Sequence, residues 1–341
     1  MDKAFLKKKA VDIVKILAFV LVFFIILQVL SVTVFTETSA LKFNNNKKDA
    51  YSFINEEENT IEVVAIGNSD VYSGFVPLEL FREYGYTSVV SASIHQTIPE
   101  SQKILKMLFE KQSPKLVIIE TDMFYDGETV DNEKLKKEDW LSDFFDHMEP
   151  EFFAHNIDNV FSIFRFHNYW QGGKNNIENS PYNSHGYRYN TRTCVLKQSD
   201  YMVETSEIDD ISNINKEQTD EMIEYCKSQG AEVMILALPS INTWNYARHN
   251  AVEKYASERN LPFIDLNLHY EDMGISMTSC FRDEGNHLNY NGAKAVTLFV
   301  GDYIQRNYSI EDMRNHEKCA SWNLDLEKFD RYRSTSNKSE E

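Results

Sequence analysis

The sequence predicts an α/β protein: a parallel sheet covered by helices on both faces, behind an N-terminal transmembrane helix. Two observations lead to this expectation. Residues 16–35 form an uncharged, apolar run of 20 residues, and short apolar segments alternate with helical patterns between residues 61 and 306. Strand–helix alternation favours a parallel sheet with right-handed crossovers. In such sheets, ligands bind beyond the carboxyl ends of the strands.

The first 40 residues are expected to anchor the chain in a membrane. At 1.5 Å per residue, the run 16–35 spans about 30 Å of hydrocarbon. Five lysines come before it: Lys3, Lys7, Lys8, Lys9 and Lys15. This bias predicts a cytoplasmic N-terminus, with everything after about residue 37 on the far side of the membrane. A cleaved signal peptide with a small-residue site at 38–40 is the alternative, although the run exceeds the 7–15 apolar residues usual for such peptides.

Five strands and five helices are expected in this alternation. The strands lie at 61–67, 87–92, 116–120, 232–238 and 262–266, each a short apolar run bounded by turn residues. Helices are expected at 77–84, 100–112, 219–228, 244–258 and 290–306. The first of these has proline at its start and Gly85 behind it, as helix boundaries often do.

Three stretches lie outside this alternation. Residues 41–60 are polar and predict a stalk between the membrane and the domain. Residues 123–215 interrupt the domain 61–307 with an aromatic-rich, helical insertion, either a small packed subdomain or a cap over a groove. Residues 308–341 are predicted to be a charged tail whose last ten residues are disordered.

Charge and cysteine content exclude several kinds of protein. The whole chain carries −18, and residues 1–40 hold five lysines and three acids, so the rest has 30 basic against 50 acidic residues. A domain this acidic is not expected to bind nucleic acid. The four cysteines (Cys194, Cys226, Cys280 and Cys319) do not have the spacing of a zinc site. They allow three disulfide pairings, and the sequence does not indicate which of these forms. No glycine-rich phosphate loop follows the first strand, which argues against a nucleotide site.

Two motifs on the expected rim of the sheet predict nucleophilic catalysis. Ser69 lies in the turn after the first strand, and His287 lies between the last strand and the last helix, with acids just before it. Both residues should therefore lie at the carboxyl ends of the strands. A serine needs a neighbouring base to become a nucleophile, and that base needs a carboxylate to hold its tautomer.

The residues of these motifs resemble a known superfamily. The sequence 67–70, Gly-Asn-Ser-Asp, is similar to the Gly-Asp-Ser block of the SGNH/GDSL hydrolases, and 284–287, Glu-Gly-Asn-His, resembles their Asp-x-x-His block. The resemblance implies a three-layer, flavodoxin-like fold over about 60–307. It is closest to membrane-anchored envelope members, namely the D protein of teichoic-acid D-alanylation and SGNH-type O-acetyltransferases of alginate export.

The resemblance also implies the roles of the site residues. Ser69 would be the nucleophile and His287 the base. The family's acid lies three residues before the histidine, which is Glu284, but Asp283 is favoured because a shorter acid on a tight turn has less freedom to lose. Asp265, at the end of its strand, is a third candidate. The family's oxyanion glycine and asparagine are absent from 92–96 and 120–124. The expected donors are therefore the backbone N–H of Ser69 and the side chains of Asn68 or Gln96.

Two functions follow from this interpretation. The first is an anchored extracytoplasmic serine esterase or O-acyltransferase acting on acyl esters of a cell-envelope polysaccharide or teichoic-acid-like polymer. It implies no metal or organic cofactor. The second is a non-catalytic accessory protein of the same fold, which binds polymer or a multi-pass membrane acyltransferase. The absent oxyanion residues favour the second function, and the complete serine, histidine and acid set favours the first.

Overall fold

The computed structural model describes residues 3–35, 48–125, 161, 163, 183–197 and 200–336. The chain divides into two units, one formed by Met1–Lys48 with Asp131–Ile177 and the other by Asp49–Val130 with Glu178–Glu341. The aromatic residues predicted to form the insertion lie almost entirely outside the described residues.

The described part of the first unit is dominated by one helix, α1, Lys3–Thr33. Its segment Val11–Thr33 has 23 residues and is long and apolar enough to cross a membrane. At 1.5 Å per residue it measures about 35 Å, slightly more than the hydrocarbon thickness. The predicted apolar helix is therefore present, as an anchor or a signal sequence requires.

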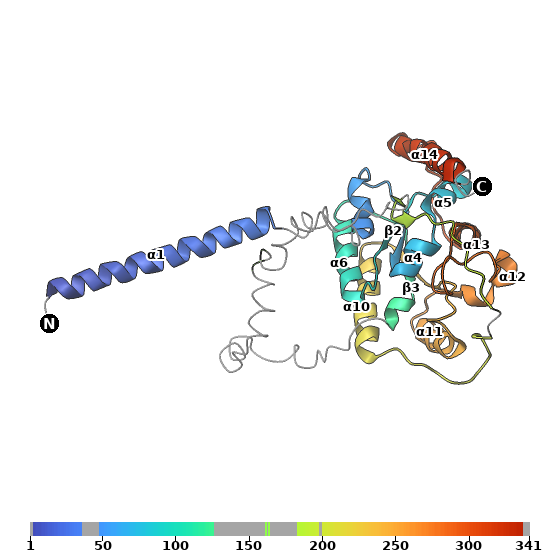
Figure 1. Ribbon diagram of the computed structural model, residues 1–341, viewed down its shortest axis with the longest axis horizontal. Helices are drawn as coiled ribbons and strands as arrows, with labels where there is room; N and C mark the ends of the chain where they lie inside the picture. Colours follow the sequence, from blue (N-terminus) through green and yellow to red (C-terminus); the bar gives the residue numbers. More distant parts are fainter. Residues whose placement is uncertain are drawn as a thin grey trace. The chain divides into compact units, whose positions relative to one another are not determined.

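A five-stranded parallel sheet forms the centre of the second unit. Its strands are β1 (Val63–Gly67), β2 (Ser88–Ala92), β3 (Leu116–Glu120), β6 (Glu232–Ala237) and β7 (Phe263–Asp265). They lie in the order β2-β1-β3-β6-β7, with Val64 of β1 opposite Val89 and Val117. This order is the flavodoxin-like 2-1-3-4-5 arrangement, so the predicted fold class is confirmed. Figure 1 labels β2 and β3 among the surrounding helices. The strands are buried almost throughout, as expected for a parallel sheet covered on both faces.

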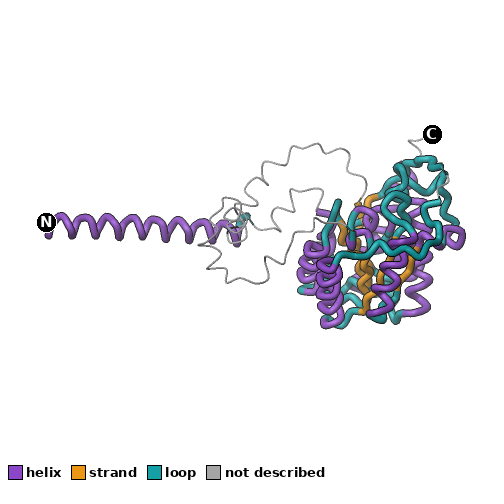
Figure 2. The backbone as a smooth tube through the Cα atoms, turned by 90° about the horizontal axis from the view of Figure 1, so that it is seen from below, coloured by secondary structure: helices purple, strands orange, loops and turns teal. Residues whose placement is uncertain are grey.

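Helices cover both faces of this sheet, as the tube in Figure 2 shows. The longer ones are α5 (Pro77–Tyr84), α6 (Ile98–Phe109), α10 (Asn213–Ser228), α11 (Tyr246–Glu258) and α13 (Tyr290–Asn307). On one face α6 packs against α10 through Phe109 and Tyr225, and α10 is tied to α11 by a 2.6 Å hydrogen bond from Tyr255 to Asp220. On the other face α5 packs against α13.

Short elements complete the described chain. These are the helices α4 (Ser69–Gly74) and α12 (Tyr270–Met273), the 3-10 turns η2 (Asp122–Phe124), η5 (Leu266–Leu268) and η6 (Glu317–Cys319), and the hairpin strands β4 (Asn183–Ser184) and β5 (Tyr187–Arg188). Helix α6 begins two residues earlier than the pattern predicts, because Thr97 and Glu100 form a capping box around Pro99.

The domain extends further at both ends than the sequence indicates. The 3-10 helix η1, Asp49–Asn55, lies within the predicted stalk, yet it buries Tyr51 and Phe53. At the other end α14, Ala320–Ser336, lies within the predicted charged tail and buries Trp322 and Phe329 in the core. The two ends meet where Trp322 Nε1 donates a 3.1 Å hydrogen bond to Glu56. Stalk and tail are therefore parts of the domain as far as they are described.

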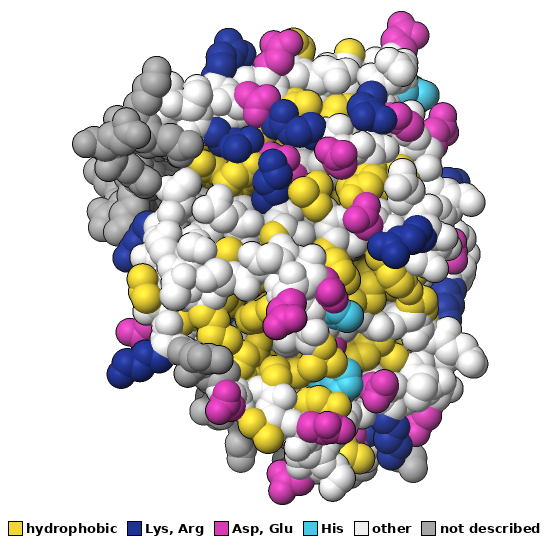
Figure 3. Space-filling view, turned by 90° about the vertical axis from the view of Figure 1, so that its right-hand side faces the viewer, with side chains coloured by type: hydrophobic (Ala, Val, Ile, Leu, Met, Phe, Trp, Pro, Cys, Tyr) yellow, Lys and Arg dark blue, Asp and Glu magenta, His cyan; other side chains and the backbone are white. Residues whose placement is uncertain are grey.

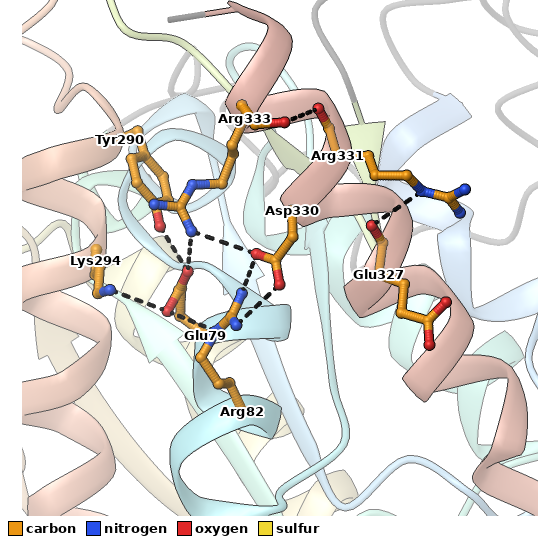
Figure 4. Close-up of polar contacts among 9 residues, drawn as sticks. Glu79, Arg82, Tyr290, Lys294, Glu327, Asp330, Arg331 and Arg333 are labelled. Carbon is orange, nitrogen blue, oxygen red and sulfur yellow. Dashed lines mark hydrogen bonds and ion pairs between the residues drawn. The ribbon is translucent and has the colours of Figure 1, made fainter.

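A buried carboxylate fastens α14 to the rest of the domain. Glu79 of α5 is 1% exposed and accepts a 2.5 Å hydrogen bond from Tyr290 of α13. Three cations surround it in Figure 4: Arg82 of α5 at 3.3 Å, Lys294 of α13 at 3.4 Å and Arg333 of α14 at 3.3 Å. One carboxylate thus links three helices.

The remaining surface is mixed in character. The face in Figure 3 shows apolar side chains grouped across its middle and basic side chains gathered along its upper part. A cavity of about 520 Å³ lies at the opposite end of the strands from the predicted site, lined among others by Ala231, Pro262 and Tyr308.

All four cysteines are free thiols. Burial raises the pKa of the Cys226 thiol to about 12, so it is an inert core residue.

Candidate active site

Ser69 stands at the turn where β1 passes into α4. Asn68 is the N-cap of α4, and its side-chain oxygen accepts a 3.1 Å hydrogen bond from the backbone N–H of Asp70. Gly67, just before the turn, has no room for a side chain. A Cβ atom there would come within 2.6 Å of Val71 and 2.7 Å of Glu120. The close approach of β1, α4 and the end of β3 therefore fixes the position of the half-buried serine.

His287 lies in the connection before α13, which is closed by an antiparallel bridge between Phe281 and Leu288. Its Nδ1 is 2.5 Å from Oδ2 of Asp283. The other carboxylate oxygen of Asp283 accepts hydrogen bonds from the backbone N–H groups of Asn286 and His287, each at 3.0 Å, and of Gly285 at 3.3 Å. Gly285 has a φ of +109°, a conformation that favours glycine. A single tight turn therefore holds both the acid and the imidazole.

These contacts keep Asp283 ionised. Burial by itself raises the pKa of this carboxyl, but the hydrogen bonds from the His287 ring and from the backbone of His287 and Asn286 outweigh it and lower the pKa to about 2. Glu284, the alternative acid, is exposed, and its carbonyl accepts a hydrogen bond from Asn242. The structure thus brings Asp283, and not Glu284, to the imidazole.

The opposite edge of the imidazole faces the serine turn. His287 Nε2 lies 3.8 Å from Oδ1 of Asp70, the residue that follows Ser69. The ring also stacks on Tyr72 of α4, with centroids 6.5 Å apart and planes inclined by 11°. No hydrogen bond joins Ser69 Oγ and His287 within the described part of the chain. Such bonds commonly tighten only when substrate is bound.

The three expected oxyanion donors differ in whether their N–H groups already have an acceptor. The backbone N–H of Ser69 belongs to the first turn of α4, where helix N–H groups lack intrahelical acceptors. The Asn68 amide donates a 2.5 Å hydrogen bond to Asp122. Gln96 is fully buried, and its amide donates to the carbonyl of Ser91 at 2.9 Å and to Ser101 at 3.0 Å. The prediction for Gln96 is corrected accordingly: its amide braces the loop after β2.

Asp265, the third candidate for the acid beside His287, pairs with a different histidine. It ends β7, and its Oδ2 lies 2.9 Å from Nδ1 of His249 and accepts a 2.8 Å hydrogen bond from Trp244. The hydrogen bond to Asp265 is the main cause that raises the pKa of His249. This buried pair joins β7 to α11, so Asp265 orients His249 and not His287.

Three acidic side chains lie together beneath the serine turn. Glu120, at the end of β3, is buried, and its Oε1 accepts a 2.6 Å hydrogen bond from the backbone N–H of Asp122. Burial raises the pKa of the Glu120 carboxyl well above its usual range, and the charges of Asp122 and Asp70 raise it further. The folded protein therefore holds the Glu120 proton more tightly than water does, and Oε1 supports the turn through its hydrogen bond from Asp122.

The raised pKa of Glu120 predicts how the stability of the protein depends on pH. Folding raises the pKa of Glu120, so the folded state holds the proton more tightly than the unfolded state does. The free energy of unfolding therefore falls as the pH rises above about 4.3, the pKa of this carboxyl in the unfolded chain. We expect Glu120→Gln to remove this part of the slope when urea unfolding is followed from pH 5 to 9. The matched exposed change, Glu284→Gln, should retain it. Equal slopes in both variants would contradict a raised pKa of Glu120.

Three residues of this region were not predicted from the sequence. Asp70 and Tyr72 follow Ser69 on α4, and Arg282 precedes Asp283. The signal for the first two was available: Asp70 is the direct sequence neighbour of the nucleophile, and Tyr72, three positions after it on a helix, lies on the same helix face. Arg282 was overlooked because its sequence position alone does not show whether a neighbouring acid neutralises it.

No protein-family model matches the chain, and no curated protein does. Among solved structures it is similar to a GDSL-like lipase from Bacteroides thetaiotaomicron, with 16% identity, a TM-score of 0.38, and coverage of 77% of this chain and 98% of that one. It is also similar to a lipase/acylhydrolase from Enterococcus faecalis, with 12% identity, a TM-score of 0.37, and coverage of 74% and 99%. At these values the chemistry of the site has to be argued from its own residues.

Proposed function

We propose that this protein is a serine esterase or O-acyltransferase with Ser69, His287 and Asp283 as its catalytic residues. One observation carries the proposal. An ionised carboxylate holds Nδ1 of an imidazole whose Nε2 faces the turn of a serine at the carboxyl end of a central strand. This is the arrangement by which an acid fixes the tautomer of a base that activates a nucleophile.

The proposed reaction proceeds in two acyl transfers. Ser69 Oγ attacks the ester carbonyl while His287 Nε2 takes the hydroxyl proton, and Asp283 stabilises the resulting imidazolium. The tetrahedral intermediate collapses, the C–O bond to the alcohol breaks, and the imidazolium returns the proton to the departing oxygen. Water or a second hydroxyl then attacks the acyl-serine and gives its proton to His287. The bond between the acyl carbon and Ser69 Oγ breaks, the imidazolium returns the proton to Oγ, and the acid or the transferred ester is released.

We propose further that the reaction takes place outside the cytoplasm on acyl esters of envelope polymers. The support is the helix Val11–Thr33, the lysines before residue 16, and the resemblance of the two motifs to anchored envelope proteins. A multi-pass membrane acyltransferase would be a suitable partner, because it could supply acyl groups at the same membrane surface.

The proposal is tested by labelling the full-length protein in detergent with a fluorophosphonate, which reacts with activated serines. We expect the wild type to be labelled, and Ser69→Ala and His287→Ala to lose labelling while keeping their circular dichroism spectra. A folded wild type that remains unlabelled would reject an activated serine and favour the non-catalytic accessory function. The exposed change Ser334→Ala serves as the control and should label like the wild type.

A further inference from the structure

Arg282 lies beside the proposed catalytic histidine. Its backbone N–H donates a 3.0 Å hydrogen bond to the carbonyl of His287, and its side chain is half-buried. The guanidinium carbon is 5.9 Å from the centre of the Tyr72 ring, the same ring that stacks on His287. The guanidinium and the imidazole therefore both lie beside the same aromatic ring.

The charge of Arg282 is not neutralised within the described part of the chain. No carboxylate there lies within 4.0 Å of its guanidinium. Every other half-buried arginine that the structure describes has such a partner: Arg82, Arg188, Arg248, Arg259 and Arg333. Acids are abundant in this chain, which carries −18 overall. A shortage of carboxylates therefore does not explain the unpaired guanidinium.

Leaving a partly buried cation unpaired is unfavourable for the free protein. Tyr72 offsets part of this cost through its ring face. Arg188, 4.2 Å from the same ring, differs because its Nε is bound to Asp49 at 2.7 Å. Arg282 thus keeps its planar set of N–H donors, which matches the geometry of carboxylates and phosphates.

We propose that Arg282 is a specificity-determining residue that binds a carboxylate or phosphate group of the substrate next to the ester attacked by Ser69. This inference rests on the proposed function, which it deepens by naming the substrate class. One neighbouring acid bears on the orientation of the substrate. Asp70 lies 3.8 Å from His287 Nε2 and repels an anion there, so the anionic group is expected at the guanidinium of Arg282 beside Tyr72.

Binding is measured first, because it does not require turnover. Full-length Ser69→Ala protein in detergent is titrated calorimetrically with dimethyl succinate, monomethyl succinate and 1-acetylglycerol 3-phosphate. These probes carry no charge, a carboxylate and a phosphate, and the tighter of the two anions identifies the group. We expect Arg282→Gln to weaken binding of that anion by about 10- to 100-fold, the usual contribution of a charge-assisted hydrogen bond. Binding of dimethyl succinate should stay the same.

Arg306→Gln is the matched control, made in the same Ser69→Ala background. Arg306 is exposed in the last turn of α13, about 25 Å along that helix from the site, and its removal changes the net charge equally. Arg282→Lys should restore part of the affinity, because lysine keeps the charge but not the planar donors. Equal anion affinity in the Arg282→Gln and Arg306→Gln proteins would overturn the proposal, and so would equal losses for neutral and anionic probes.

Turnover by the protein with Ser69 intact separates the two proposals. If the ratio of kcat/KM for the tighter-binding anionic ester over dimethyl succinate falls about 10-fold or more in Arg282→Gln, with the neutral ester unaffected, both are supported. Arg282-dependent anion binding without any turnover would reject the proposed esterase function and leave the anion site standing. Turnover of both esters at a ratio that does not change with Arg282 would reject the anion site alone.

Discussion

Replacing Asp283 by asparagine is expected to lower kcat for ester hydrolysis by about 10⁴-fold, the loss known for the equivalent change in serine proteases. The asparagine oxygen can keep the three backbone hydrogen bonds of the turn. Its amide would then donate to His287 Nδ1. The imidazole proton would be forced onto Nε2, which could no longer accept the proton of Ser69. The turn would be preserved while the base is lost.

The matched control is Glu284→Gln, which neutralises the neighbouring acid. Because Glu284 is exposed and the acid bound to His287 is Asp283, we expect kcat to stay within about twofold of the wild type. Steady-state kinetics with 4-nitrophenyl acetate, alongside circular dichroism, measures both variants. A large loss in Glu284→Gln with an active Asp283→Asn would assign the acid to Glu284 instead.

The second large effect concerns stability. Glu79→Gln is expected to lower the free energy of unfolding by about 3 kcal/mol, the lower end of the range for breaking a buried ion pair. The neutral amide would leave Arg82, Lys294 and Arg333 facing one another without their shared anion. The lower end applies because the side chains of these cations are 27–38% exposed and water can partly replace the carboxylate.

Urea unfolding followed by circular dichroism measures this change. The control is Asp330→Asn in the same cluster, whose side chain is 46% exposed, and which should cost less than about 1 kcal/mol. Tryptophan fluorescence adds a local readout, since Trp322 is a buried residue of α14, the helix that Glu79 fastens. A Glu79→Gln protein no less stable than Asp330→Asn would show that the cations do not depend on the buried carboxylate.

The sheet could be predicted from the sequence because each strand is a short apolar run that is buried on both faces. Strand ends agree to within two residues, and β3 agrees fully. The choice between Asp283 and Glu284 could not be made in this way. It depends on the backbone direction at Gly285, where a φ of +109° turns one acid toward the imidazole and leaves the other in water.

Helix α14 was missed for a different reason. Trp322, Leu326 and Phe329 have helical spacing, but charged residues between them hide the pattern in the overall composition. The partners of Gln96 and Asp265 were also not predictable, because they depend on long-range neighbours such as Ser101 and His249. Local patterns therefore located the reacting groups, while tertiary contacts decided which of them meet.

The position of α14 has a consequence for biosynthesis. The groove that receives Trp322 and Phe329 is formed partly by Phe81 and Tyr290, which are made earlier in translation. Until residues 320–336 emerge from the ribosome, these apolar side chains remain uncovered and α5 lacks its last partner. The domain can therefore complete its core only after residues 320–336 have been made. Nascent chains that stall before residue 320 are expected to be recognised by chaperones and proteases as unfinished.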